Sequence, residues 1–432
     1  MNIIKRLFIT AVLLAALFTL FTIAVFCIPT SAVRENVEKS AVQIERDGLW
    51  YKPFGFYLFQ IDNMTDCLML RINATADSDR PVRAAMMAEQ YDSVGDSLHP
   101  YNTVVSSTKT IAKTGRKEGY EYVDYARYWH GYQVLLRPML TVFSYHSILT
   151  INYICLMLLA LAVCLAAYRR IGAVFALTLA ASLVLTNFFI VPLALQFSTC
   201  YYIAFAAMAF ILCRPRFADG DGCRCDEMFF ITGAVTAYMD FLTTPVLTLG
   251  MPLVTLLAMR ARRNAYRYQP ATCRPMYTTV AASVSWFAGY ALLWAAKWAI
   301  AWVLTGENVF GSAIGNARLR IGNTIVYGGR EILLTDFVQG IMETVCSRIS
   351  VWGMVAAMML TAAATILYIY KHKQKTRQYG WLLVVAAMPV AWFAVMKNHS
   401  LQHIFFTWRD FLLSVWCVIL YLCLTLRKTK AI

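Results

Sequence analysis

Charged residues are scarce in this chain. They make up 15% of its 432 residues, while hydrophobic residues make up 59%. A soluble domain is typically about a quarter charged and about half apolar. Acidic residues are the scarcer kind, with 24 Asp and Glu against 39 Lys and Arg. The composition excludes an ordinary soluble globular protein and indicates a chain that lies largely in a bilayer.

A continuous basic surface is also missing, although the formal net charge is +15. Most Lys and Arg residues stand in short blocks between long apolar runs. This pattern is typical of polytopic membrane proteins, whose cytoplasmic loops carry an excess of Lys and Arg. We therefore expect membrane lipids as neighbours and no nucleic acid as partner.

The sequence has no recognisable disulfide framework. Many of its 12 cysteines lie inside apolar runs, where a free thiol behaves as a small hydrophobic residue. Cys223 and Cys225, with Cys213 and Cys273 nearby, lack the Cys-x-x-Cys spacing that is typical of zinc sites. The sequence predicts unpaired cytosolic thiols rather than an essential disulfide or a zinc centre.

Apolar runs of about 20 residues, the length that crosses bilayer hydrocarbon, recur along the chain. The first follows Lys5 and Arg6 and extends from Leu7 to Ile28. It exceeds the apolar core of a signal peptide, which has about 7 to 15 residues. We expect an uncleaved first helix, and the alternative is a signal peptide cleaved near Ile28. The other runs are 147–168, 171–189, 197–213, 228–243, 245–259, 277–304, 350–370, 380–396 and 410–426.

The basic blocks between these runs predict the topology. All of them fall on one side if about ten helices cross the membrane and both termini are cytoplasmic. The division of 228–259 stays open, because it can form one long hairpin or two short helices around Thr243-Thr244-Pro245. The predicted parts are a first transmembrane helix at 1–28, an extracytoplasmic loop at 29–146, and a nine-helix transmembrane region at 147–432 with a second outer loop at 305–349.

The sequence Asp62-Asn-Met-Thr-Asp66 is a short polar island in the long outer loop. Its two carboxylates are four residues apart, so they share one face whether the segment is a helix or a strand. A helix N-cap formed by Asp62 or Asn63, together with a solvated Asp, would explain the motif without any chemistry. The alternative is that Asp62 and Asp66 are catalytic, with Asp62 as general base and Asp66 as its support.

The segment 122–140, with the sequence YVDYARYWHGYQVLLRPML, combines aromatic and basic residues just before the second crossing. Aromatic residues at headgroup level are typical of an amphipathic helix that lies on the bilayer. Arg127, His130 and Arg137 exceed what such a helix needs. We expect them to meet an anionic headgroup.

Further polar residues are expected on the same outer face. Asp240 ends an apolar run, and Lys297 lies within one, where a charge indicates either function or snorkelling to the interface. The turn at 397–410 brings together His399, His403 and Arg409. The four-residue spacing of the histidines lacks a third metal ligand. A phosphate site fits better, because Arg and protonated His make charge-assisted hydrogen bonds to phosphate oxygens.

Taken together, these features predict cations that hold a phosphate, an apolar body that admits a lipid tail, and a carboxylate that takes a proton from a hydroxyl. The organisation resembles the GT-C superfamily of integral-membrane glycosyltransferases. The segments DNMTD, RYWHGYQVLLRPML, YMDFLTTPVLTLGMPL and HSLQHIFFTWR also look like parts of bacterial membrane proteins of this kind. The resemblance implies an all-α polytopic fold and inverting transfer from a polyprenyl-phosphate sugar to a glycan, lipid or protein acceptor of the cell envelope.

Two points of this resemblance leave alternatives open. DNMTD is not a plain Asp-x-Asp motif, so the identity of the base and the use of a divalent cation, Mg or Mn, are undecided. A transporter or flippase of lipid-linked glycans is the main alternative, although the chain shows no internal repeat of the kind that many transporters have. A polymerase of lipid-linked glycans is a further alternative.

Overall fold

The computed structural model describes residues 3–55, 59–93, 103–123, 125–218, 222–267, 275–322, 331, 333–343 and 378–426. These residues form an almost entirely helical membrane protein. The predicted crossing 350–370 and the basic block from Lys371 to Arg377 lie outside the described residues. Among the described residues, five segments are long and apolar enough to cross a membrane. They are α1 (Ile3–Phe26), α7 (Tyr145–Arg170), α9 (Leu195–Cys213), α13 (Pro275–Thr305) and the segment Ile404–Leu426.

The remaining helices of the bundle are shorter or more polar. Several of their bounds follow the apolar runs of the sequence closely. They are α8 (Ala173–Leu185), η2 (Phe188–Leu193), α10 (Pro215–Ala218), α11 (Gly222–Met239), α12 (Pro245–Arg267), α18 (Trp381–Val395) and α19 (Lys397–Gln402). The segment Ile404–Leu426 consists of α20 (Ile404–Thr407), η4 (Trp408–Asp410) and α21 (Phe411–Leu426). The open question at 228–259 is resolved, since α11 and α12 are separate helices joined by residues 240–244.

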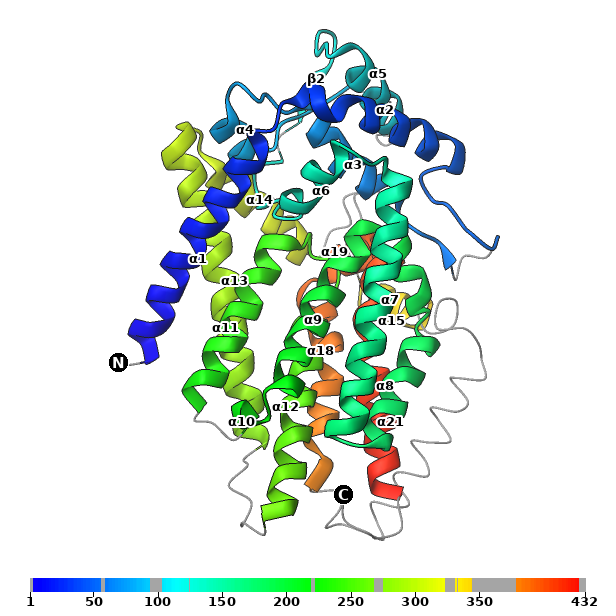
Figure 1. Ribbon diagram of the computed structural model, residues 1–432, viewed down its shortest axis with the longest axis vertical. Coiled ribbons are helices and arrows are strands. Elements are labelled where there is room, and N and C mark those ends of the chain that lie inside the picture. Colours follow the sequence, from blue (N-terminus) through cyan, green and yellow to red (C-terminus); the bar gives the residue numbers. More distant parts are fainter. Residues whose placement is uncertain are drawn as a thin grey trace.

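The segment 29–146, the predicted outer loop, folds into a layer of its own across one end of the bundle. It contains α2 (Thr30–Asp47), α3 (Asn63–Thr75), α4 (Pro81–Met87), α5 (Val104–Thr114) and α6 (Gln133–Leu140). The strands β1 (Gln90–Asp92) and β2 (Glu121–Val123) pair antiparallel, with Tyr91 opposite Tyr122. Figure 1 shows α2 and α5 lying above the long helices. The second predicted outer loop, 305–349, contains α14 (Val309–Ile321) and α15 (Leu334–Glu343).

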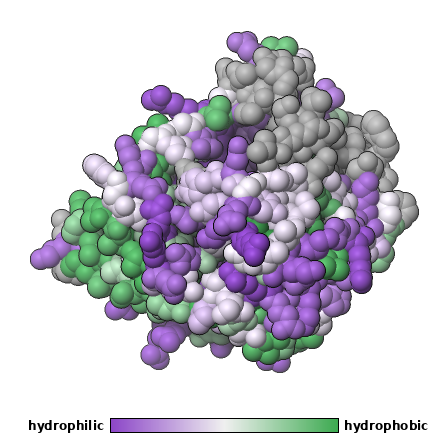
Figure 2. Space-filling model, turned by 90° about the horizontal axis from the view of Figure 1, so that it is seen from above, coloured by the Kyte–Doolittle hydropathy of each residue, from purple (hydrophilic) through white to green (hydrophobic). Residues whose placement is uncertain are grey.

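The surface agrees with this division into a layer and a bundle. Seen from above, the layer is mostly hydrophilic, and hydrophobic residues gather at the edge (Figure 2). Large apolar side chains are exposed along α1 and α13, including Phe8, Leu20, Phe287 and Val303. In water such exposure would be costly, so these faces suit contact with lipid.

Helices α11 and α13 pack with their backbones in contact at two glycines. A Cβ atom at Gly233 would clash with the carbonyl oxygen of Trp286, and one at Gly289 would clash with that of Phe230. Small residues allow this close approach between membrane helices. The tight pair holds the end of α11 and the following Asp240 in a fixed place.

Candidate functional site

Asp62 forms the N-cap of α3. Its carboxylate accepts hydrogen bonds from the backbone N–H of Thr65 at 3.0 Å and from the Thr65 hydroxyl at 2.7 Å. The side-chain amide of Gln196, in α9, donates a further hydrogen bond to it. Asp62 is fully buried. The N-cap is therefore confirmed, but the solvated Asp expected beside it is wrong, because Asp66 is fully buried as well. A catalytic role for Asp62 stays a prediction.

Asp66 binds the start of α9. Its carboxylate accepts hydrogen bonds from the backbone N–H groups of Leu195 at 2.7 Å and Gln196 at 3.1 Å, and from the Tyr145 hydroxyl. A carboxylate at this end of a helix also compensates the partial positive charge of the helix dipole. Burial raises the pKa of Asp66 to about 7, while these three hydrogen bonds favour the ionised form and limit the rise. Asp66 is thus a buried carboxyl group that can exchange a proton near neutral pH.

The hydrogen-bond partners of Asp62 and Asp66 bear on whether the two carboxylates could hold a divalent cation. Every hydrogen bond to the two carboxylates comes from an N–H or O–H donor. No group of three or more His, Cys, Asp or Glu side chains gathers elsewhere among the described residues. Both carboxylates thus already have hydrogen-bond partners within the protein, and a Mg or Mn ion at this pair stays a prediction.

Arg137 is a fully buried connection between three segments. Its Nη2 donates to the carbonyl oxygen of Ile28 at 2.7 Å and to the Thr30 hydroxyl at 2.9 Å, and its Nη1 donates to Asn73 Oδ1 at 3.2 Å. Ile28 lies between α1 and α2, Thr30 is the first residue of α2, and Asn73 belongs to α3. The expected contact of Arg137 with a headgroup is replaced here by contacts within the protein.

His130 lies in a buried aromatic cluster rather than on an interfacial helix. Residues 125–132 are not helical, and His130 has a positive φ of 56°. Its Nε2 is 2.9 Å from the carbonyl oxygen of Tyr125, and its Nδ1 is 3.0 Å from the Tyr132 hydroxyl. Burial lowers the pKa of His130 to about 3, so the ring is neutral at pH 7. The guanidinium of Arg127 stacks on the rings of Tyr125 and Tyr128.

Helix α19 adds a second buried imidazole. His399 Nε2 is 2.9 Å from the carbonyl oxygen of Leu242, and Arg320 of α14 contacts its Nδ1. Burial, helped by the charge of Arg320, lowers the pKa of His399 well below its usual range. Arg320 also donates to the Tyr128 hydroxyl at 2.9 Å. The protonated His399 expected from the sequence is not stable here at neutral pH, so the arginine provides the positive charge. His403 packs beside His399, with ring centroids 4.7 Å apart.

Asp240 and Arg409 both approach the first turns of α9. Asp240 accepts a hydrogen bond from the backbone N–H of Thr243 at 2.9 Å and another from its hydroxyl, which is 3.7 Å from Cys200 Sγ. The guanidinium of Arg409 lies 3.8 Å from the ring centroid of Phe197. Four residues singled out in the sequence, Asp62, Asp66, Asp240 and Arg409, therefore surround the start of one helix.

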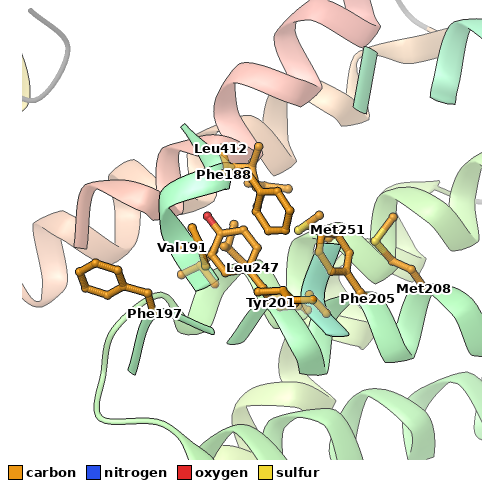
Figure 3. Packing of buried hydrophobic residues seen from close by; sticks show 14 of the residues in the cluster. Phe188, Val191, Phe197, Tyr201, Phe205, Met208, Leu247, Met251 and Leu412 are labelled. Atoms are coloured by element: carbon orange, nitrogen blue, oxygen red, sulfur yellow. The ribbon is translucent and has the colours of Figure 1, made fainter. Parts of the chain in front are cut away.

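The core beside this helix is aromatic and closely packed. Phe188 of η2 lies 5.3 Å from Tyr201 and 5.6 Å from Phe205, measured between ring centroids. Figure 3 shows Tyr201 and Phe205 among Phe188 and Leu247, with Phe197 at some distance from them. This packing fixes the direction of α9 and hence the position of its N-terminal turn.

Lys297 belongs to a different part of the molecule. It is fully buried in α13, and its Nζ donates to the carbonyl oxygen of Met86 at 2.6 Å. The ammonium group also lies 5.9 Å from the ring of Trp129. The snorkelling interpretation of Lys297 is therefore wrong, because its side chain is buried against α4.

A groove with a volume of about 1650 Å³ runs along α9. At one end it is lined by Met69, Tyr132 and Leu195, next to the buried carboxylates. Its middle is apolar and is formed by α7, α9 and α11. Ala206, Phe210 and Ile231 line it and are exposed, so the groove opens on the surface of the bundle. Its other end is lined by six arginines and one glutamate: Arg6, Arg170, Arg214, Arg216, Arg224, Arg263 and Glu227.

Several contacting residues were not expected from the sequence. Gln196 and Tyr145 hold the acidic motif, and Arg320 holds His399. Asp410, next to Arg409, is a fully buried carboxyl group close to the first turn of α12. Asp410 could have been found from the sequence, because it is a charged residue directly beside an apolar run. Gln196 and Tyr145 could not, because each is an ordinary residue within or next to an apolar run.

The chain matches no protein-family model, no curated protein and no solved structure.

Proposed function

We propose that this protein is a membrane-embedded glycosyltransferase of the GT-C type, which transfers a sugar with inversion from a polyprenyl-phosphate donor to a cell-envelope acceptor. One observation carries the proposal: the apolar groove begins at Leu195, whose backbone N–H binds Asp66. A polyprenyl tail in this groove leaves its phosphate near the carboxylate end. A proton acceptor then stands close to the bond that the transfer breaks.

Asp66 suits the role of general base better than Asp62. Its pKa of about 7 is close to the value at which a base works best at neutral pH. Two of its donors are backbone N–H groups, and the third is the Tyr145 hydroxyl. The hydroxyl of the acceptor would take the place of the Tyr145 hydroxyl. Asp62, as the cap of α3, would hold Asp66 in position through Gln196.

Arg409 is the cation that best fits the phosphate of the donor. It lies against Phe197, the residue that follows Gln196 in the first turn of α9. Negative charge grows on the phosphate as the sugar leaves, and a nearby guanidinium stabilises that charge. Neutral His130 and His399 would act as hydrogen-bond donors or acceptors in this site rather than as cations.

The proposal includes the topology of about ten crossings, with both termini cytoplasmic and the site extracytoplasmic in the cell membrane. The common position of the arginines of α1, α7, α10, α11 and α12 at one end of the groove supports it. Single cysteines at Ser93 and at Arg169, in a chain without its native cysteines, test it. An impermeant thiol reagent added outside should label Ser93→Cys alone. Labelling of Arg169→Cys alone would show that the protein has the opposite orientation, and it would rule out the proposed extracytoplasmic catalytic site.

The reaction is tested with purified protein in detergent and a polyprenyl-phosphate sugar. The rate of sugar release or transfer should fall by about 10²- to 10⁴-fold in Asp66→Asn, because the general base is missing. The matched control is Asp79→Asn, because Asp79 is exposed in the same loop. A folded Asp66→Asn protein with normal turnover would exclude Asp66 as the base.

A flippase is a second candidate, because the groove reaches from the carboxylate end to the arginine end of the bundle. A groove that extends between both ends of the bundle would let the headgroup of a lipid move from one leaflet to the other while its tail stays in the membrane. Proteoliposomes separate the two functions. Movement of an intact lipid-linked sugar between leaflets, without release of the sugar, would favour transport over transfer.

A further inference from the structure

The arginine end of the groove has a composition that the transfer reaction does not use. Six arginines and one glutamate line it, and Arg6 and Glu227 form an ion pair. The positive charge is therefore well in excess of the negative charge along this lining. The N-terminal turn of α11, which carries Arg224, lies at the same end, and its helix dipole favours an anion.

The apolar part of the groove continues directly from these arginines. Along the lining, Arg214 and Arg216 follow Phe210 and Cys213 of α9. With a rise of 1.5 Å per residue, α9 is about 28 Å long, which is close to the thickness of bilayer hydrocarbon. Half of this length matches the acyl chains of one leaflet. The groove therefore offers one lipid molecule both an apolar channel and a cationic rim.

We propose that this end of the groove binds an anionic phospholipid, with its phosphate on the arginines and its acyl chains along α9. Arginine is well suited to this headgroup, because its planar guanidinium can form two parallel hydrogen bonds to a phosphate. The site is at the opposite end from Asp66 and is separate from the donor phosphate site. It does not depend on the transfer reaction.

The direct test is native mass spectrometry of the full chain in detergent with dioleoylphosphatidylglycerol or dioleoylphosphatidylcholine. The wild-type protein should retain the anionic lipid in preference to the zwitterionic one. The double variant Arg214→Gln/Arg216→Gln should bind phosphatidylglycerol roughly 10- to 30-fold more weakly, since each basic residue near a headgroup contributes about fivefold. Both side chains are exposed, so the variant should fold.

The matched control is Lys5→Gln/Arg169→Gln. It removes the same charge from the same end, at exposed residues that do not line the groove. It should bind like the wild-type protein. Equal losses in the two double variants would show a general effect of surface charge and would overturn the proposal, as would equal binding of the two lipids by the wild-type protein.

A second pair of variants tests the apolar part. Ala207→Trp fills the groove and should weaken binding of the dioleoyl lipid, whereas Ala162→Trp, on an exposed face of α7 outside the groove, should not. Inorganic phosphate at millimolar concentration should not displace the lipid. Displacement by phosphate, together with unchanged binding in Ala207→Trp, would show a site for free phosphate instead of a lipid.

Discussion

The backbone N–H of Gln196 donates a hydrogen bond to Asp66 at 3.1 Å, although the two residues are 130 positions apart in the chain. The side chain of the same glutamine donates to Asp62. The two carboxylates, which are four residues apart in the sequence, therefore share one partner on α9. Through Gln196, the layer formed by residues 29–146 is attached to the helix that lines the groove.

Asp62 should contribute to stability through its cap, whatever its part in a reaction. Asp62→Ala should lower the free energy of unfolding by about 0.5–2 kcal/mol, because α3 loses its cap. Asp62→Ser should recover part of this, since a serine hydroxyl can accept the hydrogen bond from Thr65. Thermal unfolding in detergent measures both. Equal melting temperatures for Asp62→Ala and the wild-type protein would contradict the capping role.

Asp66 should make stability depend on pH. Its pKa in the folded protein, about 7, is above its ordinary value of 3.8. Between these values the unfolded chain releases a proton that the folded protein keeps, so stability should fall as the pH rises from about 4 to about 7. Asp66→Asn should reduce this slope, and Asp79→Asn should retain it. Melting temperatures measured across this range give the comparison, and an unchanged slope in Asp66→Asn would assign the effect to other groups.

Arg409 should affect the donor more than the acceptor. Arg409→Ala should raise the donor KM and lower kcat, because the phosphate gains charge as its bond to the sugar breaks. Arg409→Lys should recover only part of the activity, since lysine lacks the planar pair of donors. Steady-state kinetics with the donor concentration varied measures this. Full activity of a folded Arg409→Ala protein would show that the guanidinium only packs on Phe197.

The contact of α11 with α13 should not tolerate a methyl group. Gly233→Ala would place a Cβ against the carbonyl oxygen of Trp286, so the helices would have to separate. We expect a lower melting temperature and a lower yield of monodisperse protein in detergent. Gly311→Ala in α14 is the control, because nothing lies within 4 Å of the added Cβ. Equal stability of the two variants would show that the helices can adjust at no cost.

The sequence by itself determined that this is a helical membrane protein and where many of its helices lie. The runs 147–168, 197–213 and 277–304 became α7, α9 and α13 with shifts of at most two residues. Whether a segment can cross lipid depends on its own length and composition, so these helices can be predicted from the sequence of each segment alone. The cap formed by Asp62 was equally local, because its partner Thr65 is three residues away.

Only the tertiary structure decided what the polar residues contact and whether they are charged. Arg137 donates a hydrogen bond to the carbonyl oxygen of Ile28, and Lys297 donates one to that of Met86. In both pairs the two residues are more than 100 positions apart in the chain. The neutral state of His130 follows from its burial among residues of several segments. A protonation state and a hydrogen-bond partner depend on which distant groups exclude water around a side chain, and the spacing of residues along the chain does not contain that information.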